Sequence, residues 1–168
     1  MKHGSYDRSG TSVHFGSVYY YKTQVASYQG HDDNPLLEKT AFGWTIDDLG
    51  MRLMLNRLYE RYEVPIFIVE NGLGTYDQLE DQQIHDDYRI DYLSKHIQQM
   101  ELAIQDGVEV IGYLTWSAMD VVSTSEGMMS KRYGFIYVDR NDDGSGTYQR
   151  IPKDSFYWYR QLIQEKDL

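Results

Sequence analysis

Two kinds of hydrophobic pattern alternate along the chain: short continuous apolar runs, and longer stretches in which apolar residues recur every three or four positions. The clearest run is residues 65–69, which leads into Glu70 and a Gly-x-Gly turn. A continuous apolar run bounded by proline and glycine predicts a strand buried on both faces, as in parallel sheets covered by helices. Glu70 is then expected at the strand end, where α/β folds place their chemistry. The alternative is that Glu70 only caps the turn or pairs with a neighbour.

The three- and four-residue spacing predicts helices. Thr45 and the acid three positions later, Asp48, have the form of a capping box, and the helix that they open should end before Pro65. The expected inner side of this helix consists of Leu49, Leu53, Leu58 and Tyr62.

Two further helices are predicted in the second half of the chain. One begins at Asp86 and is closed by Gly107, a typical C-terminal glycine, and the other begins at Asp154. The expected buried stripes are Ile90, Leu93, Ile97, Met100 and Ile104 on the first, and Phe156, Tyr159, Leu162 and Ile163 on the second.

Strands are predicted between and after these helices. Residues 13–21 and 108–116 are expected to join the run at 65–69 in one parallel sheet with right-handed crossovers. Residues 132–138 and 147–151 form a predicted hairpin. The alternation of strands and helices indicates an α/β fold, but three main-sheet strands are too few for a closed barrel, which needs eight.

Composition places the chain among ordinary globular proteins. Its 168 residues, 41% hydrophobic and 25% charged, suit one domain, expected over residues 13–168 after a flexible segment 1–12. The net charge of −10 disfavours nucleic acids and membrane surfaces as partners. The absence of cysteine excludes disulfides and thiolate metal sites. No apolar run approaches the ~18 residues of a membrane span, so a cytoplasmic location is expected.

A metal site is not expected. Asp139, Asn141, Asp143 and Gly144 match the first half of a calcium-binding loop, but Arg150 stands where the loop requires its bidentate acid. The five histidines share no ligand spacing. No cofactor is predicted either.

Residues 123–133 bring together groups that could bind a small anion. Ser123 and Ser125 supply hydroxyls, Lys131 an ammonium group and Tyr133 a phenol, close behind a predicted strand end. Such donors suit a phosphate group, particularly in so acidic a chain. The alternative, a solvated loop with basic residues at the surface, stays open on this chemistry alone.

Four motifs occur in the order and spacing of a known family. They are the Val-Glu-Asn-Gly of residues 69–72, the helix start at 87–93, Trp116-Ser117-x-x-Asp120, and Lys-Arg-Tyr-Gly-Phe at 131–135. Together they resemble the C-terminal part of glycoside hydrolase family 1, and within it the bacterial 6-phospho-β-glucosidases. The resemblance implies the C-terminal part of a (β/α)8 TIM barrel, comprising about the last three βα units, a β-hairpin and a terminal helix.

The resemblance assigns roles to three aromatic or acidic residues. Glu70 corresponds to the catalytic nucleophile of a retaining mechanism, at the end of barrel strand seven. Trp116 corresponds to the platform under the sugar, which suits the stacking of an apolar sugar face on indole. Tyr21 resembles the tyrosine that orients the nucleophile, although three successive tyrosines leave its register open.

The same resemblance makes Ser125, Lys131 and Tyr133 the binding site for a 6-phosphate group, with Ser123 as a competing candidate for the serine. Relatives that act on unphosphorylated sugars carry a glutamate near this serine. A serine removes a charge that would repel phosphate, and this disfavours a plain β-glucosidase.

The chain departs from the family in one large respect. The family's acid/base glutamate lies in an Asn-Glu motif on strand four, and no Asn-Glu dipeptide occurs here. We therefore expect a fragment of an enzyme that hydrolyses β-glucosides phosphorylated at the 6-position. We also expect it to form a homo-oligomer or to associate with a missing N-terminal half. The alternative is an inactive remnant that binds phosphosugars or assembles with another chain.

Overall fold

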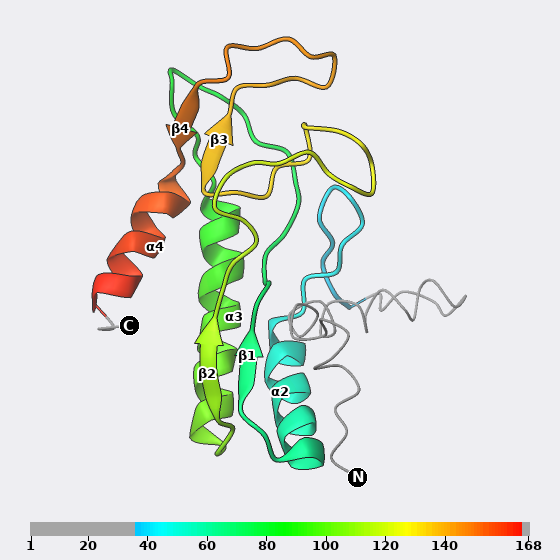
Figure 1. Cartoon of the computed structure of the whole chain (residues 1–168), viewed down its shortest axis with the longest axis vertical. Coiled ribbons are helices and arrows are strands. Elements are labelled where there is room, and N and C mark those ends of the chain that lie inside the picture. The colour runs from blue at the N-terminus through cyan, green and yellow to red at the C-terminus, as the bar shows by residue number, and fades with distance from the viewer. Residues whose placement is uncertain (1–35, 166–168) are drawn as a thin grey trace. The chain divides into compact units, whose positions relative to one another are not determined.

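A computed structural model describes residues 36–165. Residues 1–12, the predicted strand at 13–21 and its Tyr21 lie outside this range. The elements follow one another as α2 (Asp48–Tyr62), β1 (Ile66–Ile68), α3 (Asp87–Gln105), β2 (Val110–Tyr113), β3 (Ile136–Val138), β4 (Arg150–Pro152) and α4 (Asp154–Glu165) (Figure 1).

The described residues divide into two compact units. Unit 1 holds α2, β1, β2 and the part of α3 from Ser94 onward, whereas unit 2 holds residues 40–42, 72–93 and 116–165. The sheet of unit 1 consists of β1 and β2, which pair in parallel. The sheet of unit 2 consists of β3 and β4, which pair antiparallel.

Helix α2 forms where the sequence predicts it, but its cap and its buried face differ from the prediction. Asp47, not Thr45, is the N-cap, and its side chain accepts a hydrogen bond from the Gly50 amide at 2.9 Å. Leu49 and Leu53 are exposed. Leu49 lies nine residues before Leu58, about two and a half turns, and so points to the opposite side. The buried stripe is formed by Met51 and Leu55, with Met54, Leu58 and Tyr59 packed beside them.

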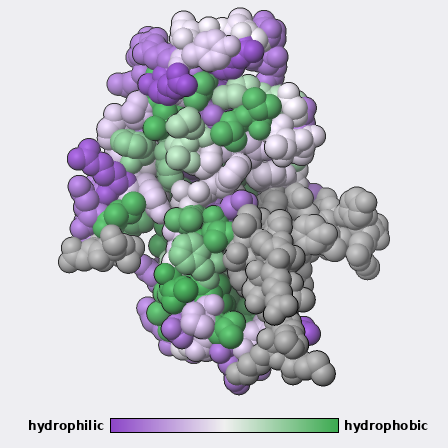
Figure 2. Space-filling view, viewed as in Figure 1, coloured by the Kyte–Doolittle hydropathy of each residue, from purple (hydrophilic) through white to green (hydrophobic). Residues whose placement is uncertain are grey.

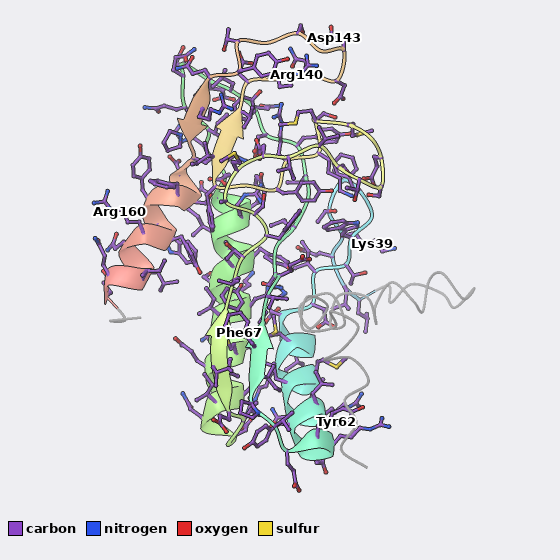
Figure 3. All side chains as sticks on the ribbon, viewed as in Figure 1. Lys39, Tyr62, Phe67, Arg140, Asp143 and Arg160 are labelled. Carbon is purple, nitrogen blue, oxygen red and sulfur yellow. The ribbon has the colours of Figure 1, made fainter. Side chains whose placement is uncertain are left out.

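Strands β1 and β2 confirm the predicted parallel pairing. Ile66 lies opposite Val110, and Phe67 lies opposite Gly112. Ile66 and Ile68 are buried, but Phe67 between them is only half-buried, so the run is fully buried on one face and not on both. A Cβ atom on Gly112 would lie 2.1 Å from the Phe67 ring, which shows how closely that ring covers β2 (Figure 3). The core of unit 1 consists of Met51, Leu55, Ile66, Ile68, Ala103 and Val108.

Helix α3 ends as predicted, but its apolar stripe is shorter. Gly107 adopts φ +103° beyond the last turn, and its amide donates to the Ile104 carbonyl at 3.0 Å. Leu93 and Ile97 are buried. Ile104 is exposed, and Ala103 takes the buried position instead.

The hairpin of unit 2 is confirmed, with later strand starts than predicted. Tyr137 pairs with Ile151, and Arg140 and Asp143 lie in the connecting loop (Figure 3). Tyr137 and Ile151 pack with Ile84 in a small core. Helix α4 begins at Asp154 as predicted, but it is less buried than expected: Phe156, Tyr159 and Leu162 are half-buried and Ile163 is exposed.

None of the helices in the described part of the chain is both long and apolar enough to cross a membrane.

Candidate active site

Glu70 follows strand β1 by two residues and is half-buried. The residue after it, Asn71, is buried, and its side-chain oxygen accepts a hydrogen bond from the Tyr113 hydroxyl at 2.7 Å. Tyr113 belongs to β2, and the Leu114 amide donates to the Ile68 carbonyl at 2.7 Å. The end of β1 that presents Glu70 is thus held in place by the neighbouring parallel strand.

In unit 2, the backbone at Gly72 lies close against the backbone at Trp116. A Cβ atom on Gly72 would lie 2.1 Å from the Trp116 carbonyl oxygen, so only glycine fits at this position. Trp116 itself is 42% exposed, and its peptide bond to Ser117 is cis. The indole meets the Tyr133 ring edge-on at 6.4 Å between centroids. An exposed indole beside a buried phenol is suited to stacking against the apolar face of a sugar.

The structure brings together the four residues that the sequence predicts for anion binding. Ser123, Lys131 and Tyr133 are buried, and Ser125 is exposed. The Tyr133 hydroxyl donates to Ser123 Oγ at 3.0 Å, and the two serine Oγ atoms lie 3.2 Å apart. The Lys131 ammonium also faces the Phe42 ring at 4.9 Å. We call Ser123, Ser125, Lys131 and Tyr133 the anion cluster.

Sequence reasoning missed a fifth member of this region, Glu126. Its carboxylate accepts hydrogen bonds from Ser123 and Ser125, and from Lys131 Nζ at 2.9 Å. Although partial burial raises the pKa of the Glu126 carboxyl, these three hydrogen bonds outweigh it and lower the pKa to about 2. The anion cluster therefore surrounds an anion already. The signal in the sequence was an acid placed directly after the two serines.

Asp120 fixes the backbone that carries the anion cluster. It is buried, and its carboxylate accepts from the amides of Tyr133 at 3.2 Å and Gly134 at 2.9 Å. It also accepts from Lys153 Nζ at 2.8 Å and lies 3.4 Å from Arg132 Nη1. The motif pairing Trp116 with Asp120 was recognised in the sequence, but this positioning role was not.

Arg89 holds the same backbone from helix α3. Its buried guanidinium donates to the Tyr133 carbonyl at 2.7 Å and to the Leu73 carbonyl at 3.2 Å. Its Nε donates to Asp86 at 3.0 Å, and Asp86 in turn accepts from the Ser155 amide at 2.8 Å. A buried arginine therefore connects the segment after Glu70, the anion cluster and the start of α4.

The calcium-like residues have other partners. Asp139 accepts from the Thr147 amide at 2.9 Å, and Asp143 accepts from the Ser145 amide at 2.8 Å. Within residues 36–165, no group of three acidic, histidine or cysteine side chains is placed to hold a metal ion.

The predicted site residues do not all fall in one unit. Tyr21 lies outside the described residues. Glu70 belongs to unit 1, whereas the anion cluster and Trp116 belong to unit 2.

Comparison with known proteins decides the family. The model of glycosyl hydrolase family 1 matches residues 8–168. The chain belongs to glycosyl hydrolase family 1. It is 57% identical over 131 residues to a 6-phospho-beta-glucosidase of Dickeya chrysanthemi and 56% identical over 131 residues to a phospho-cellobiase of Klebsiella oxytoca. Each match covers 77% of this chain and 28% of the relative.

Solved structures agree with this assignment. The chain superposes on the family 1 β-glucosidase of Thermotoga maritima with a TM-score of 0.71 and 41% identity, over 78% of this chain and 29% of that protein. This confirms the fold class, the C-terminal part of a (β/α)8 barrel. The chain spans only 28% of the length of these two curated relatives.

Proposed function

We propose that this chain supplies the nucleophile and the phosphate site of a 6-phospho-β-glucosidase, an enzyme that hydrolyses β-glucosides phosphorylated at the 6-position. The observation that carries the proposal is the anion cluster, in which two hydroxyls and a buried ammonium group converge on one carboxylate. Relatives named 6-phospho-beta-glucosidase and phospho-cellobiase support the same substrate class.

In this proposal Glu70 is the catalytic nucleophile. Its carboxylate attacks the anomeric carbon, the bond to the leaving oxygen breaks, and a glycosyl ester forms on Glu70. A second carboxyl group, about 5–5.5 Å away in retaining enzymes, protonates the leaving oxygen and then activates the water that hydrolyses the ester. No Asn-Glu dipeptide is present to provide that second group, so natural substrates require a carboxylate from outside this sequence. General acid/base help is typically worth ~10²–10⁴-fold in rate.

The phosphate is bound by the anion cluster. Lys131 provides a charged donor, and Ser123 and Ser125 provide hydroxyl donors, which together complement a phosphate dianion. The Tyr133 hydroxyl orients Ser123 through their 3.0 Å hydrogen bond. Trp116, edge-on to Tyr133, then supports the sugar ring beside the phosphate.

The nucleophile can be tested without the acid/base group. An aryl glucoside whose leaving group departs as an anion, such as 2,4-dinitrophenyl β-glucoside 6-phosphate, needs no protonation. We expect a burst of dinitrophenolate and a phosphoglucosyl adduct on the peptide containing Glu70, detected by mass spectrometry. Glu70→Gln should form no adduct, because an amide is a poor nucleophile. Glu109→Gln, at an exposed position before β2, should behave as the parent chain.

The unphosphorylated aryl glucoside tests the substrate class. It should label Glu70 far more slowly, because it makes no use of the anion cluster. Equal labelling by both compounds would reject the phosphate site. A folded chain that forms no adduct with either compound would reject catalysis and leave a phosphosugar-binding remnant.

A further inference from the structure

The turn that carries Glu126 has a fixed backbone. The Ser123 amide donates to the Met128 carbonyl and the Gly127 amide donates to the Ser123 carbonyl, both at 2.8 Å. Gly127 adopts φ +69°, a left-handed conformation that glycine accommodates without strain. The Glu126 amide also approaches Ser123 Oγ at 3.4 Å. The turn is thus closed on Ser123, and it directs the Glu126 side chain back onto the anion cluster.

Glu126 and a phosphate would need the same protons. A serine hydroxyl has one proton to donate, and those of Ser123 and Ser125 are both donated to Glu126. Lys131 also donates to this carboxylate, at 2.9 Å. The low pKa of the Glu126 carboxyl keeps it ionised at neutral pH, so it would repel a phosphate placed beside it.

We propose that Glu126 is a specificity-determining residue that competes with the substrate for the anion cluster: its carboxylate occupies the cluster in the unliganded chain and must move out before a phosphate binds. This inference rests on the proposed phosphate site. The Glu126 side chain is 29% exposed, which gives it a route to solvent that the buried Lys131 does not have.

To bind, a ligand must interact with the anion cluster more strongly than the Glu126 carboxylate does. A phosphate dianion carries about two charges and three acceptor oxygens, and so offers more than the carboxylate that it displaces. A sugar hydroxyl or a single carboxylate, as in a glucuronic acid, offers no more than Glu126 does. The site therefore discriminates against these ligands by the cost of displacing Glu126, in addition to selecting phosphate by attraction.

Calorimetric titration of the full chain with glucose 6-phosphate tests the inference. Glu126→Gln keeps the shape of the side chain and removes its charge, so we expect Kd to fall about ten-fold, the equivalent of one charge-assisted hydrogen bond. Binding of glucuronate should appear or strengthen in the same variant. Glu80→Gln, an exposed turn residue of unit 2, makes the same change in net charge and should leave both ligands unaffected.

Lys131→Met separates this inference from the proposed function. It keeps the buried stem of the side chain and removes the ammonium group. Weaker glucose 6-phosphate binding in Lys131→Met together with tighter binding in Glu126→Gln supports both proposals. Weaker binding in both variants would mean that Glu126 helps to position Lys131, which overturns the competition but keeps the phosphate site. Unchanged or undetectable binding throughout, in variants shown by circular dichroism to be folded, would reject both.

Discussion

Buried charged residues hold the segment that carries Lys131 and Tyr133. Asp120 is central among them, because its carboxylate accepts hydrogen bonds from three backbone amides, from the Lys153 ammonium at 2.8 Å and from the Arg132 guanidinium at 3.4 Å. All three side chains are buried. Buried charges of this kind are retained only when each has its partner, because desolvation of an unpaired charge is costly.

Asp120→Asn therefore has a clear expected outcome. The amide keeps the shape of the side chain but leaves Arg132 without the charge of Asp120, and leaves Lys153 with Asp77, 2.5 Å away, as its buried carboxylate partner. We expect the free energy of unfolding to fall by about 3–5 kcal/mol, measured by chemical denaturation. Asp143→Asn, in the exposed hairpin loop, is the matched control and should change it by less than about 0.5 kcal/mol. Equal stability of the two variants would show that the buried network contributes little.

The sequence reveals the residues of the anion cluster more readily than the side chains that form hydrogen bonds with them. Ser123, Ser125, Lys131 and Tyr133 lie within one short segment, so their proximity follows from the chain itself. Glu126 belongs to the same segment, yet its role depends on where its side chain turns, which no spacing rule specifies. The contact of Arg89 with the Tyr133 carbonyl spans 44 positions and could only come from a structure.

At the scale of the element, the sequence predicts where helices and strands occur more readily than which face of each is buried. The starts of α2 and α4 and the hairpin rest on local signals: cap residues, a turn sequence and a change of periodicity. The buried face of α2 cannot be predicted from local signals, because leucine and methionine occur on both sides of the helix. Packing against β1 and α3 determines that Met51 and Leu55 are buried. Asp47 supplies the cap because Thr45 lies two residues before the N-cap position of a helix that begins at Asp48.

The cap of α2 can be tested directly. Asp47→Ala removes the acceptor for the Gly50 amide and should lower the free energy of unfolding by about 1 kcal/mol in thermal or chemical denaturation. Asp47→Asn keeps a side-chain oxygen at the same place and should restore most of this loss, because asparagine caps helices about as well as aspartate. A large effect in the asparagine variant would point to the charge of Asp47 instead of its hydrogen bond.

At the scale of the whole molecule, the fold class came from the resemblance and not from composition. The hydrophobic pattern indicates an α/β fold, but eight strands cannot be inferred from the few that the chain contains. Family motifs supplied the barrel, and the superposition on the Thermotoga maritima enzyme confirms it.

Strand β2 leaves apolar side chains in contact with solvent. Ile111 is 60% exposed and Leu114 just after the strand is 51% exposed, and Figure 2 shows hydrophobic residues gathered over this part of unit 1. Within residues 36–165, β1 and β2 pair only with each other. Exposed apolar surface on a strand favours association, either with a second copy of the chain or with the rest of a barrel.

We therefore expect the purified chain to self-associate in sedimentation velocity, with a larger mass at higher protein concentration. The net charge of −10 opposes association, so added salt should strengthen it by screening that repulsion. Ile111→Lys should shift the equilibrium toward the monomer. Gln98→Lys, at an exposed polar position on α3, adds the same charge without removing apolar surface, and should leave the association as it is. Equal shifts in the two variants would assign the effect to net charge and not to β2, and a monomer at every concentration would show that this face needs no partner.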